Sequence, residues 1–301
     1  MSRLSALLIL GLLLTACSDG TDTFVVNPPL GTAVNLDTGP IIGQSSERAA
    51  AWEYLGIPFA APPVGDLRWR APQPVEAWTE PRDATARGEF CPQFLYFTEE
   101  FAGSEDCLYL NVFRPQSEER DLPVVVWIHG GGNNNGDSGQ VTSAYDGARL
   151  AVRGDLVVVT VQYRLGALGW LYNPALRTGD PLDDSGNYGT LDLIEALQWV
   201  QRNARLFGGD ADNVTIVGES AGAANVLTLV ISEEARRLFH KGIVQSLGGS
   251  VTSQAEALED AQELEDALGI SGANESERAE QLRAVDAETL LAASNVSEII
   301  G

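Results

Sequence analysis

The chain has 301 residues, of which 44% are hydrophobic and 20% are charged, a balance typical of a globular protein rather than a disordered one. Its formal net charge of -23 argues against nucleic acid and anionic membrane surfaces as partners, because both would repel it. A chain of this length can form one large α/β domain or two smaller ones.

The N-terminus has the pattern of an export signal. Arg3 precedes an apolar run that is too short to span a bilayer as a mature helix. The following Leu-Thr-Ala-Cys ends at Cys17 and resembles the bacterial lipobox, in which the cysteine is lipidated. We therefore expect a signal peptide over 1–16 and a lipid anchor with a polar tether over 17–26. The alternative is an ordinary secretory signal cut near Ala16. Both predict an exported protein, either held at the bacterial cell envelope or secreted.

Two further cysteines, Cys91 and Cys107, form an even pair in a chain expected to reach an oxidising compartment. A disulfide between them is the default expectation, and two free buried thiols are the alternative. The chain has no Cys-x-x-Cys and no His-x-x-x-His spacing. The sequence therefore predicts no structural metal, and no cofactor is implied.

Apolar strand-like runs alternate with helical patterns along the chain. β-Branched residues dominate the runs that we interpret as strands, and the last part of the chain is rich in Ala, Glu and Leu. Continuous apolar strands that alternate with helices predict an α/β fold with a mostly parallel central sheet and helices on both faces. Strands are expected at 108–115, 123–130, 156–164, 213–218 and 241–248, and helices at 193–207, 221–231 and from 252 onward.

The strand at 213–218 leads directly into Gly218-Glu219-Ser220-Ala221-Gly222. A Gly-x-Ser-x-Gly between a strand and a helix is the nucleophile elbow of α/β-hydrolases, a turn so sharp that it raises the serine above the sheet. Ser220 is therefore the candidate nucleophile. The backbone N–H of Ala221, at the start of the next helix, is a candidate donor to an oxyanion.

A second glycine-rich segment, His129-Gly130-Gly131-Gly132, follows the strand at 123–130. This is the loop type that completes the oxyanion hole of esterases and lipases. Gly131 and Gly132 are the candidate donors, because glycine lets the backbone approach a substrate closely. We interpret His129 as a residue that positions this loop rather than as a base.

These motifs together resemble the type-B carboxylesterase family, which includes the cholinesterases. The resemblance extends from about residue 27 to residue 301, so 27–301 is interpreted as the N-terminal part of a carboxylesterase domain. It implies an α/β-hydrolase fold, a serine nucleophile at Ser220 and a disulfide between Cys91 and Cys107. The matching segments are 54–74, 105–115, 161–171 and 187–222.

The chain also departs from the family pattern in ways that bear on the substrate. The family commonly has an aromatic residue after the glycine loop, where this chain has Asn133, Asn134 and Asn135. The loop from Cys91 to Cys107 has no Trp, whereas cholinesterases place there the aromatic residue that holds the choline cation. The expected substrate is therefore a small carboxylic ester without a quaternary ammonium group.

The family's catalytic acid and histidine lie far after the serine, beyond residue 301 of this chain. His240 is the one histidine that follows Ser220, and it matches a non-catalytic family position. We therefore expect a C-terminally incomplete hydrolase that has a nucleophile and an oxyanion hole but no base. The alternative function is a non-catalytic surface binding or adhesion protein, because the family includes such proteins. The intact Ser220 favours the esterase.

Overall fold

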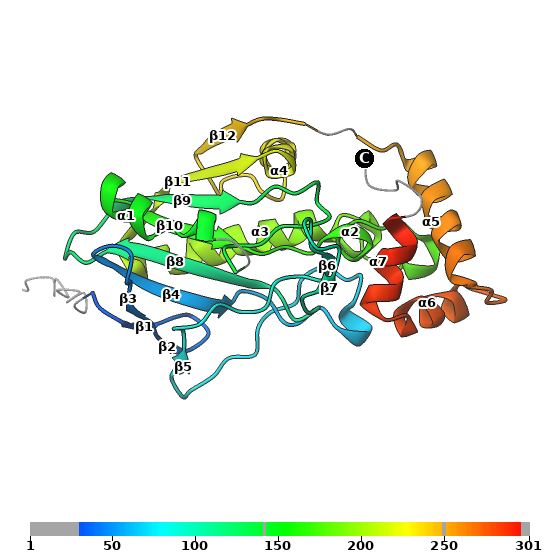
Figure 1. Cartoon of the computed structure of the whole chain (residues 1–301), viewed down its shortest axis with the longest axis horizontal. Helices are drawn as coiled ribbons and strands as arrows, with labels where there is room; N and C mark the ends of the chain where they lie inside the picture. The colour runs from blue at the N-terminus through cyan, green and yellow to red at the C-terminus, as the bar shows by residue number, and fades with distance from the viewer. Residues whose placement is uncertain (1–29, 141–142, 249–250, 296–301) are drawn as a thin grey trace, which may run out of the picture.

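The computed structural model describes residues 30–140, 143–248 and 251–295, as the coloured ribbon in Figure 1 shows. The predicted signal peptide, Cys17 and the tether over 17–26 lie outside the described residues. Among the residues that are described, no helix is both long enough and apolar enough to cross a membrane.

A seven-stranded mixed sheet forms the centre of the molecule. The four strands β12, β11, β9 and β10 are parallel to one another in that spatial order. The sheet continues from β10 through β8, β4 and β3, and these pairings are antiparallel. The strands are β3 (Gln44–Ser45), β4 (Ala51–Pro58), β8 (Tyr109–Pro115), β9 (Leu122–Ile128), β10 (Val157–Val161), β11 (Gly209–Glu219) and β12 (Lys241–Gln245).

Every strand that the sequence predicted is present, with small differences at the ends. β11 begins earlier than expected because its first residues pair irregularly with β9 between Gly209 and Val214. β12 stops at Gln245 because Ser246 has a left-handed backbone conformation, with a φ of 51°. The α/β architecture is thus confirmed, and the antiparallel strands β8, β4 and β3 extend its parallel half.

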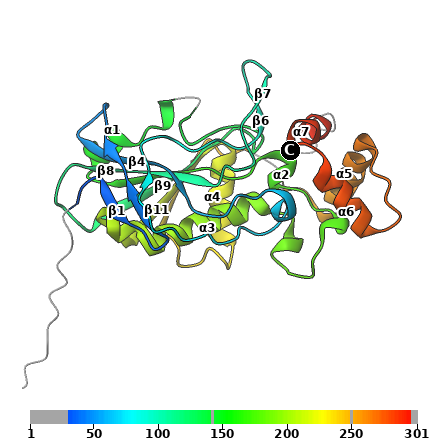
Figure 2. The ribbon, with the colours of Figure 1, turned by 90° about the horizontal axis from the view of Figure 1, so that it is seen from below.

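Helices cover the sheet on both faces, as expected; Figure 2 shows α1 and α3 on opposite sides. Valines alternate along β10: Val157 and Val159 belong to the large core beneath α3 and α4, whereas Val158 packs with Phe113 against α1. This alternation follows from the period of two along a strand. The three helices are α1 (Ala148–Gly154), α3 (Tyr188–Asn203) and α4 (Ala221–Ile231).

The last part of the chain is helical, as predicted, and lies at one end of the molecule (Figure 1). Trp69 is fully buried in the apolar cluster that these helices form with α2. The guanidinium of Arg68 donates to the carbonyl oxygens of Arg283 and Val285, which fixes the connection between α6 and α7. The helices are α2 (Gly166–Gly169), α5 (Gln254–Leu268), α6 (Glu275–Ala284) and α7 (Ala287–Asn295).

Smaller elements complete the described chain. A three-stranded sheet is formed by β1 (Ala33–Asn35), β2 (Pro40–Ile42) and β5 (Arg82–Asp83), and a short hairpin by β6 (Gln93–Phe94) and β7 (Phe101–Ala102). Single 3-10 turns occur at Gly65–Leu67, Ser143–Tyr145, Pro174–Leu176, Asp183–Ser185 and Ala204–Phe207.

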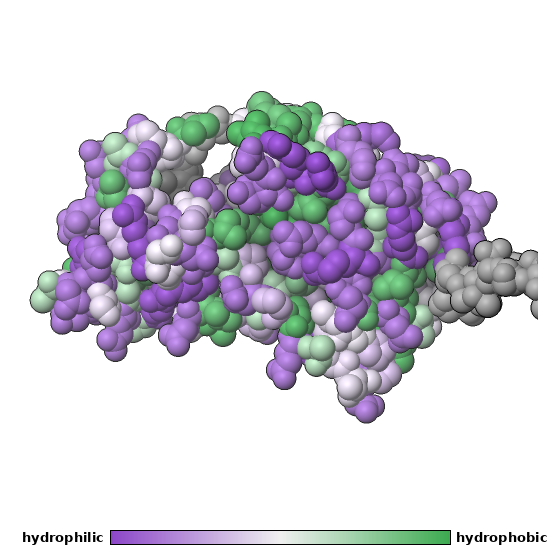
Figure 3. Space-filling model, turned by 180° about the vertical axis from the view of Figure 1, so that it is seen from behind, coloured by the Kyte–Doolittle hydropathy of each residue, from purple (hydrophilic) through white to green (hydrophobic). Residues whose placement is uncertain are grey.

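One edge of the central sheet is open to solvent. All five residues of β12 are exposed, and within the described chain this strand pairs only with β11. Figure 3 shows apolar side chains gathered at the upper rim of the molecule, where α4 and β12 lie. The exposed apolar residues of these two elements are Leu227, Val230, Ile231, Ile243 and Val244.

Candidate active site

Ser220 lies in a sharp turn between β11 and α4. Its φ of 54° and ψ of -122° fall in a region that only glycine adopts freely. Such a conformation costs about 1–3 kcal/mol and persists only where the surroundings fix it. Here the Ser220 N–H donates to Gln245 O at 3.0 Å, and its carbonyl accepts from the N–H groups of Ala223 and Ala224. The predicted elbow is therefore present, and the Ser220 side chain is half-buried.

The two glycines of the elbow are required by close backbone contacts. A Cβ atom at Gly218 would lie 2.1 Å from the carbonyl oxygen of Gly222. A Cβ atom at Gly222 would lie 2.3 Å from the carbonyl oxygen of Ile128, the last residue of β9. The turn thus closes on itself and at the same time packs against the end of the neighbouring strand.

The predicted glycine loop begins directly after β9 and lies beside this turn. A Cβ atom at Gly130 would be 2.6 Å from Glu219 O and 3.1 Å from the Cβ of Ser220. Gly131 accepts hydrogen bonds from the N–H groups of Asn134 and Asn135, at 3.1 and 3.0 Å. The structure therefore brings the loop that contains Gly131 and Gly132 next to Ser220 and Ala221.

Asn133 connects the glycine loop to two helices. Its backbone is left-handed, with a φ of 57°, a conformation that asparagine tolerates better than most residues. Its carbonyl oxygen accepts from Gly166 N–H at the start of α2 at 2.7 Å. Its side-chain oxygen accepts from the amide of Asn225 in α4 at 2.9 Å. The residue type that departs from the family pattern thus has a specific structural role in this chain.

His129 is completely buried and its imidazole makes no hydrogen bond to Ser220. Its Nδ1 lies 2.9 Å from Gly130 O, its Nε2 has no hydrogen-bond partner, and its ring stacks on Tyr163 at 4.3 Å. The Tyr163 hydroxyl donates to His129 O at 2.6 Å. Burial lowers the pKa of His129, and the carbonyl of Gly130 opposes that shift in part. These contacts fit a histidine that supports the loop.

His240 lies at the other end of the parallel strands. Its Nδ1 accepts a hydrogen bond from Val214 N–H at 3.2 Å, six residues before Ser220 along β11. Because a strand rises about 3.3 Å per residue, six residues correspond to about 20 Å along the strand. Neither imidazole is hydrogen-bonded to Ser220.

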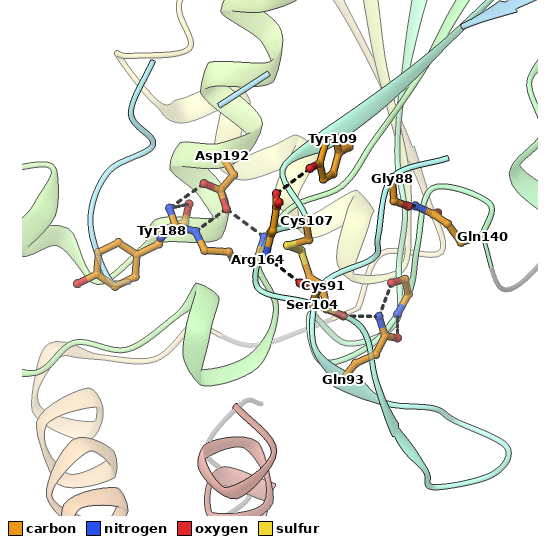
Figure 4. Close-up of a disulfide and its surroundings, with 12 residues drawn as sticks. Gly88, Cys91, Gln93, Ser104, Cys107, Tyr109, Gln140, Arg164, Tyr188 and Asp192 are labelled. Carbon is orange, nitrogen blue, oxygen red and sulfur yellow. Dashed lines mark hydrogen bonds and ion pairs between the residues drawn. A yellow bond between two sulfur atoms is a disulfide. The ribbon is translucent and has the colours of Figure 1, made fainter. Parts of the chain in front are cut away.

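A disulfide joins Cys91 to Cys107, as the sequence predicted, with a Cα–Cα distance of 5.0 Å. Figure 4 shows the bridge and Gln93, which follows Cys91 by two residues. Both cysteines are fully buried. The disulfide closes the segment that carries the β6–β7 hairpin, and this segment lies against the glycine loop through Gln93.

A cavity of about 360 Å³ adjoins the glycine loop. It lies between the β6–β7 hairpin, the asparagine segment of the loop, the start of α2 and the helix α7. The lining is mixed, with aromatic and aliphatic side chains beside two amides and a carboxylate. Its lining residues are Phe94, Leu95, Tyr96, Glu99, Asn134, Asn135, Gly166 and Leu291.

A serine elbow after a parallel strand, with a glycine loop packed beside it, defines the fold as that of an α/β-hydrolase. The model of the Carboxylesterase family matches residues 31–300. The chain belongs to this family.

Named relatives agree with this assignment. A para-nitrobenzyl esterase of Bacillus subtilis (strain 168) is 40% identical over 267 residues, which are 87% of this chain and 52% of that protein. A fumonisin B1 esterase of Sphingopyxis macrogoltabida is 50% identical over 199 residues, which are 65% of this chain and 36% of that protein. The chain thus spans about half the length, or less, of these relatives.

Solved structures also match most of this chain and about half of their own length. A PNB esterase structure superposes with a TM-score of 0.78 at 40% identity, covering 88% of this chain and 53% of that one. A carboxylesterase of Geobacillus stearothermophilus has a TM-score of 0.79 at 37% identity, and the match covers 89% of this chain and 54% of that one. The fold is therefore shared over most of this chain.

The sequence reasoning missed two polar residues that hold the glycine loop, Gln93 and Asn225. Both are almost fully buried, with 3% and 4% of their surface exposed. A weak signal existed for each, since Gln93 follows a cysteine within a family motif and Asn225 interrupts the apolar helix after the elbow. Their partners lie 43 and 92 residues away, and local sequence does not reveal such pairings.

Proposed function

We propose that this protein is the part of a carboxylic ester hydrolase that supplies the nucleophile and the oxyanion hole. Ser220 is the proposed nucleophile, and the N–H groups of Gly131, Gly132 and Ala221 are the proposed oxyanion donors. The observation that supports this most is the backbone contact between Gly130 and the Glu219–Ser220 segment, because it puts the glycine loop beside the serine. The relative named a para-nitrobenzyl esterase supports an ester substrate.

The proposed chemistry is acyl transfer. The Ser220 hydroxyl oxygen bonds to the ester carbonyl carbon while its proton passes to a base, and the carbonyl oxygen becomes an oxyanion held by the backbone donors. The carbon–oxygen bond to the alcohol then breaks, and the alcohol leaves with the proton. Water attacks the acyl-serine in the same way and releases the acid. Removing one oxyanion donor typically costs about 3 kcal/mol of transition-state stabilisation.

The acid and histidine of this mechanism are proposed to come from polypeptide beyond the 301 residues. Two observations support this: neither His129 nor His240 is hydrogen-bonded to Ser220, and the relatives extend to about twice the matched length. Loss of a triad base usually lowers turnover by about 10⁴- to 10⁶-fold. The 301-residue chain is therefore expected to hydrolyse a short p-nitrophenyl ester barely above background.

The test compares p-nitrophenol release by the 301-residue chain with release by a version extended through the downstream reading frame. The extended protein is expected to turn over, and Ser220→Ala is expected to abolish its activity, whereas Ser271→Ala, at an exposed residue among the C-terminal helices, leaves it unchanged. Robust turnover by the 301-residue chain that is lost in His240→Ala would show that the base was misplaced. Turnover that survives Ser220→Ala would reject the proposed function, and a non-catalytic binding role would then be the better hypothesis.

We also propose that Cys17 carries lipid and anchors the protein to the bacterial envelope. The support is the Leu-Thr-Ala-Cys sequence after the apolar run. Cys17→Ser is expected to move the protein from the membrane fraction to the soluble fraction. A wild-type protein found entirely in the soluble fraction, with its N-terminus after Cys17, would contradict the anchor.

A further inference from the structure

The glycine loop continues through the asparagines to Gly136, so the whole loop spans residues 129–136. Gln93 makes two hydrogen bonds to Gly136 at its closing end. Its side-chain oxygen accepts from Gly136 N–H at 2.8 Å, and its side-chain nitrogen donates to Gly136 O at 2.8 Å. The same nitrogen donates to Cys91 O at 3.0 Å. Figure 4 shows the Gln93 side chain near the disulfide, with dashed lines at its amide group. Gln93 thus connects the backbone at the disulfide to the backbone of the loop, as a strand would.

The position of Gly136 determines the position of the start of the loop. A Cβ atom on Gly136 would lie 2.4 Å from His129 Nδ1 and 2.5 Å from Gly130 O, so its backbone lies directly against both residues. A Cβ atom on Gly131 would lie 2.1 Å from Asn135 O, the residue before Gly136. The loop therefore folds back on itself, and movement of Gly136 displaces Gly130 and Gly131.

Two side-chain contacts hold the middle and the closing end of the loop separately. Asn133, in its middle, is held by Gly166 and Asn225, which lie on α2 and α4. The closing end at Gly136 is held by Gln93, which is only 3% exposed and lies close to the fully buried disulfide. Hydrogen bonds in such a water-excluded place are strong, and an unmade one is costly.

We propose that Gln93 is a positioning residue of the oxyanion hole. By fixing Gly136 it holds the N–H groups of Gly131 and Gly132 where the oxyanion forms, and the Cys91–Cys107 disulfide fixes Gln93 in turn. This inference rests on the proposed function, because it assigns these N–H groups to an oxyanion. Gln93 itself does not touch the ester.

The test uses the 301-residue chain and two variants of Gln93. Gln93→Leu keeps the volume of the side chain and removes all three hydrogen bonds, whereas Gln93→Glu retains an acceptor for Gly136 N–H but loses the donors. The matched control is Gln201→Leu, because Gln201 also bridges two backbone carbonyls, those of Ala211 and Leu238, at the far end of β11.

The first readout is hydrogen exchange, measured by NMR, at the N–H groups of Asn134 and Asn135, which donate to Gly131 O and report on the turn. Gln93→Leu is expected to speed this exchange about tenfold, which corresponds to about 1.4 kcal/mol of lost local stability. Gln93→Glu is expected to speed exchange as well, because its buried carboxylate cannot donate to the carbonyl oxygens of Gly136 and Cys91, and Gln201→Leu is expected to have no effect. Exchange that is unchanged in Gln93→Leu overturns the inference, whatever happens with the ester.

The second readout uses the protein extended through the downstream reading frame, with the same Gln93 variants, and measures single-turnover acylation of Ser220 by p-nitrophenyl acetate, followed by mass spectrometry. Because an oxyanion donor acts in the transition state, Gln93→Leu is expected to lower the maximal acylation rate about tenfold without changing the ester concentration that gives half of it. An unchanged maximal rate in a protein whose Ser220 is acylated also overturns the inference. If the wild-type serine of the extended protein is not acylated, the proposed function fails, and the exchange measurement still decides whether Gln93 holds the loop.

Discussion

The two strands that flank β11 surround Ser220 very differently. On the β9 side the contacts are backbone against backbone, since a single Cβ atom at Gly222 would collide with Ile128 O at 2.3 Å. On the β12 side the first two residues of the elbow pair with Val244 and Gln245, and Ser220 N–H donates to Gln245 O, but this strand is exposed along its whole length. Ile243 of that strand is 47% exposed.

This difference separates two requirements of acyl transfer. Holding an oxyanion requires backbone donors fixed to within a fraction of an ångström, and close packing of glycines supplies that rigidity. Moving a proton requires a titratable side chain that can take it from the serine, and neither histidine imidazole is hydrogen-bonded to Ser220. The β9 side is thus rigidly built, whereas the β12 side is open.

The largest effect on stability is expected from a methyl group added inside the elbow. Gly218→Ala places a Cβ 2.1 Å from Gly222 O, and the turn must open to relieve the collision. We expect a loss of about 3 kcal/mol in the free energy of unfolding, measured by urea titration. Gly248→Ala, where no heavy atom lies within 4 Å, is the matched control and is expected to change it by less than about 0.5 kcal/mol. Equal urea-unfolding midpoints for Gly218→Ala and Gly248→Ala would contradict the close packing of Gly218 against Gly222.

Removing the disulfide is expected to have a comparable effect from outside the elbow. The bridge closes a loop of sequence separation 16, and the chain-entropy model gives about 3 kcal/mol for a loop of that size. The Cys91→Ser/Cys107→Ser variant should lose this amount in urea titration, and reductant should destabilise the wild type but not the variant. A non-reducing peptide map with two alkylatable thiols in the folded protein would contradict the bridge.

A smaller, pH-dependent effect is expected from His129. Burial lowers its pKa in the folded state, so below about pH 6.5 the unfolded chain binds a proton that the folded chain does not. Stability should therefore fall as the pH falls through about 6.5, by at most about 1.4 kcal/mol per pH unit from this group alone.

Urea titrations across this pH range test the contribution of His129. His129→Asn should have a flatter pH dependence than the wild type. Equal slopes for the wild type and His129→Asn would show that the buried imidazole does not titrate differently in the folded state.

The smallest change in stability is expected from a substitution in the exposed edge strand β12. An exposed, apolar, unpaired strand edge favours association with other edges, so the wild type is expected to self-associate as its concentration rises. Val244→Lys, in β12, should reduce this association in analytical ultracentrifugation while changing unfolding by less than about 0.5 kcal/mol. Val251→Lys adds the same charge outside the strand, where Val251 is 97% exposed, and should have little effect. Equal association of both variants would show that the edge is not the contact surface.

Much of the fold was predictable because its signals are local. Runs of β-branched residues gave β8, β9, β10, β11 and β12, and the helical spacing after Leu193 gave α3. This helix ends at Asn203, earlier than expected, and the 3-10 turn that follows it ends before Gly208, which has a left-handed conformation. The strand β4 was not predicted from the residues, although its segment matched the family pattern. Pairing direction was not predictable either, because β-propensity does not distinguish a parallel from an antiparallel neighbour.

The sequence by itself determined the elbow at Ser220, the glycine loop and the pair of cysteines, because each depends on residue types at fixed short spacings. Only the tertiary structure decided how these segments hold one another: Gly130 against Ser220, Asn133 bonded to Asn225, and Gln93 bonded to Gly136. These contacts join residues that are 43 to 92 positions apart. Their geometry arises from the order of strands in the sheet, which brings the ends of β9 and β11 together and which no local pattern encodes.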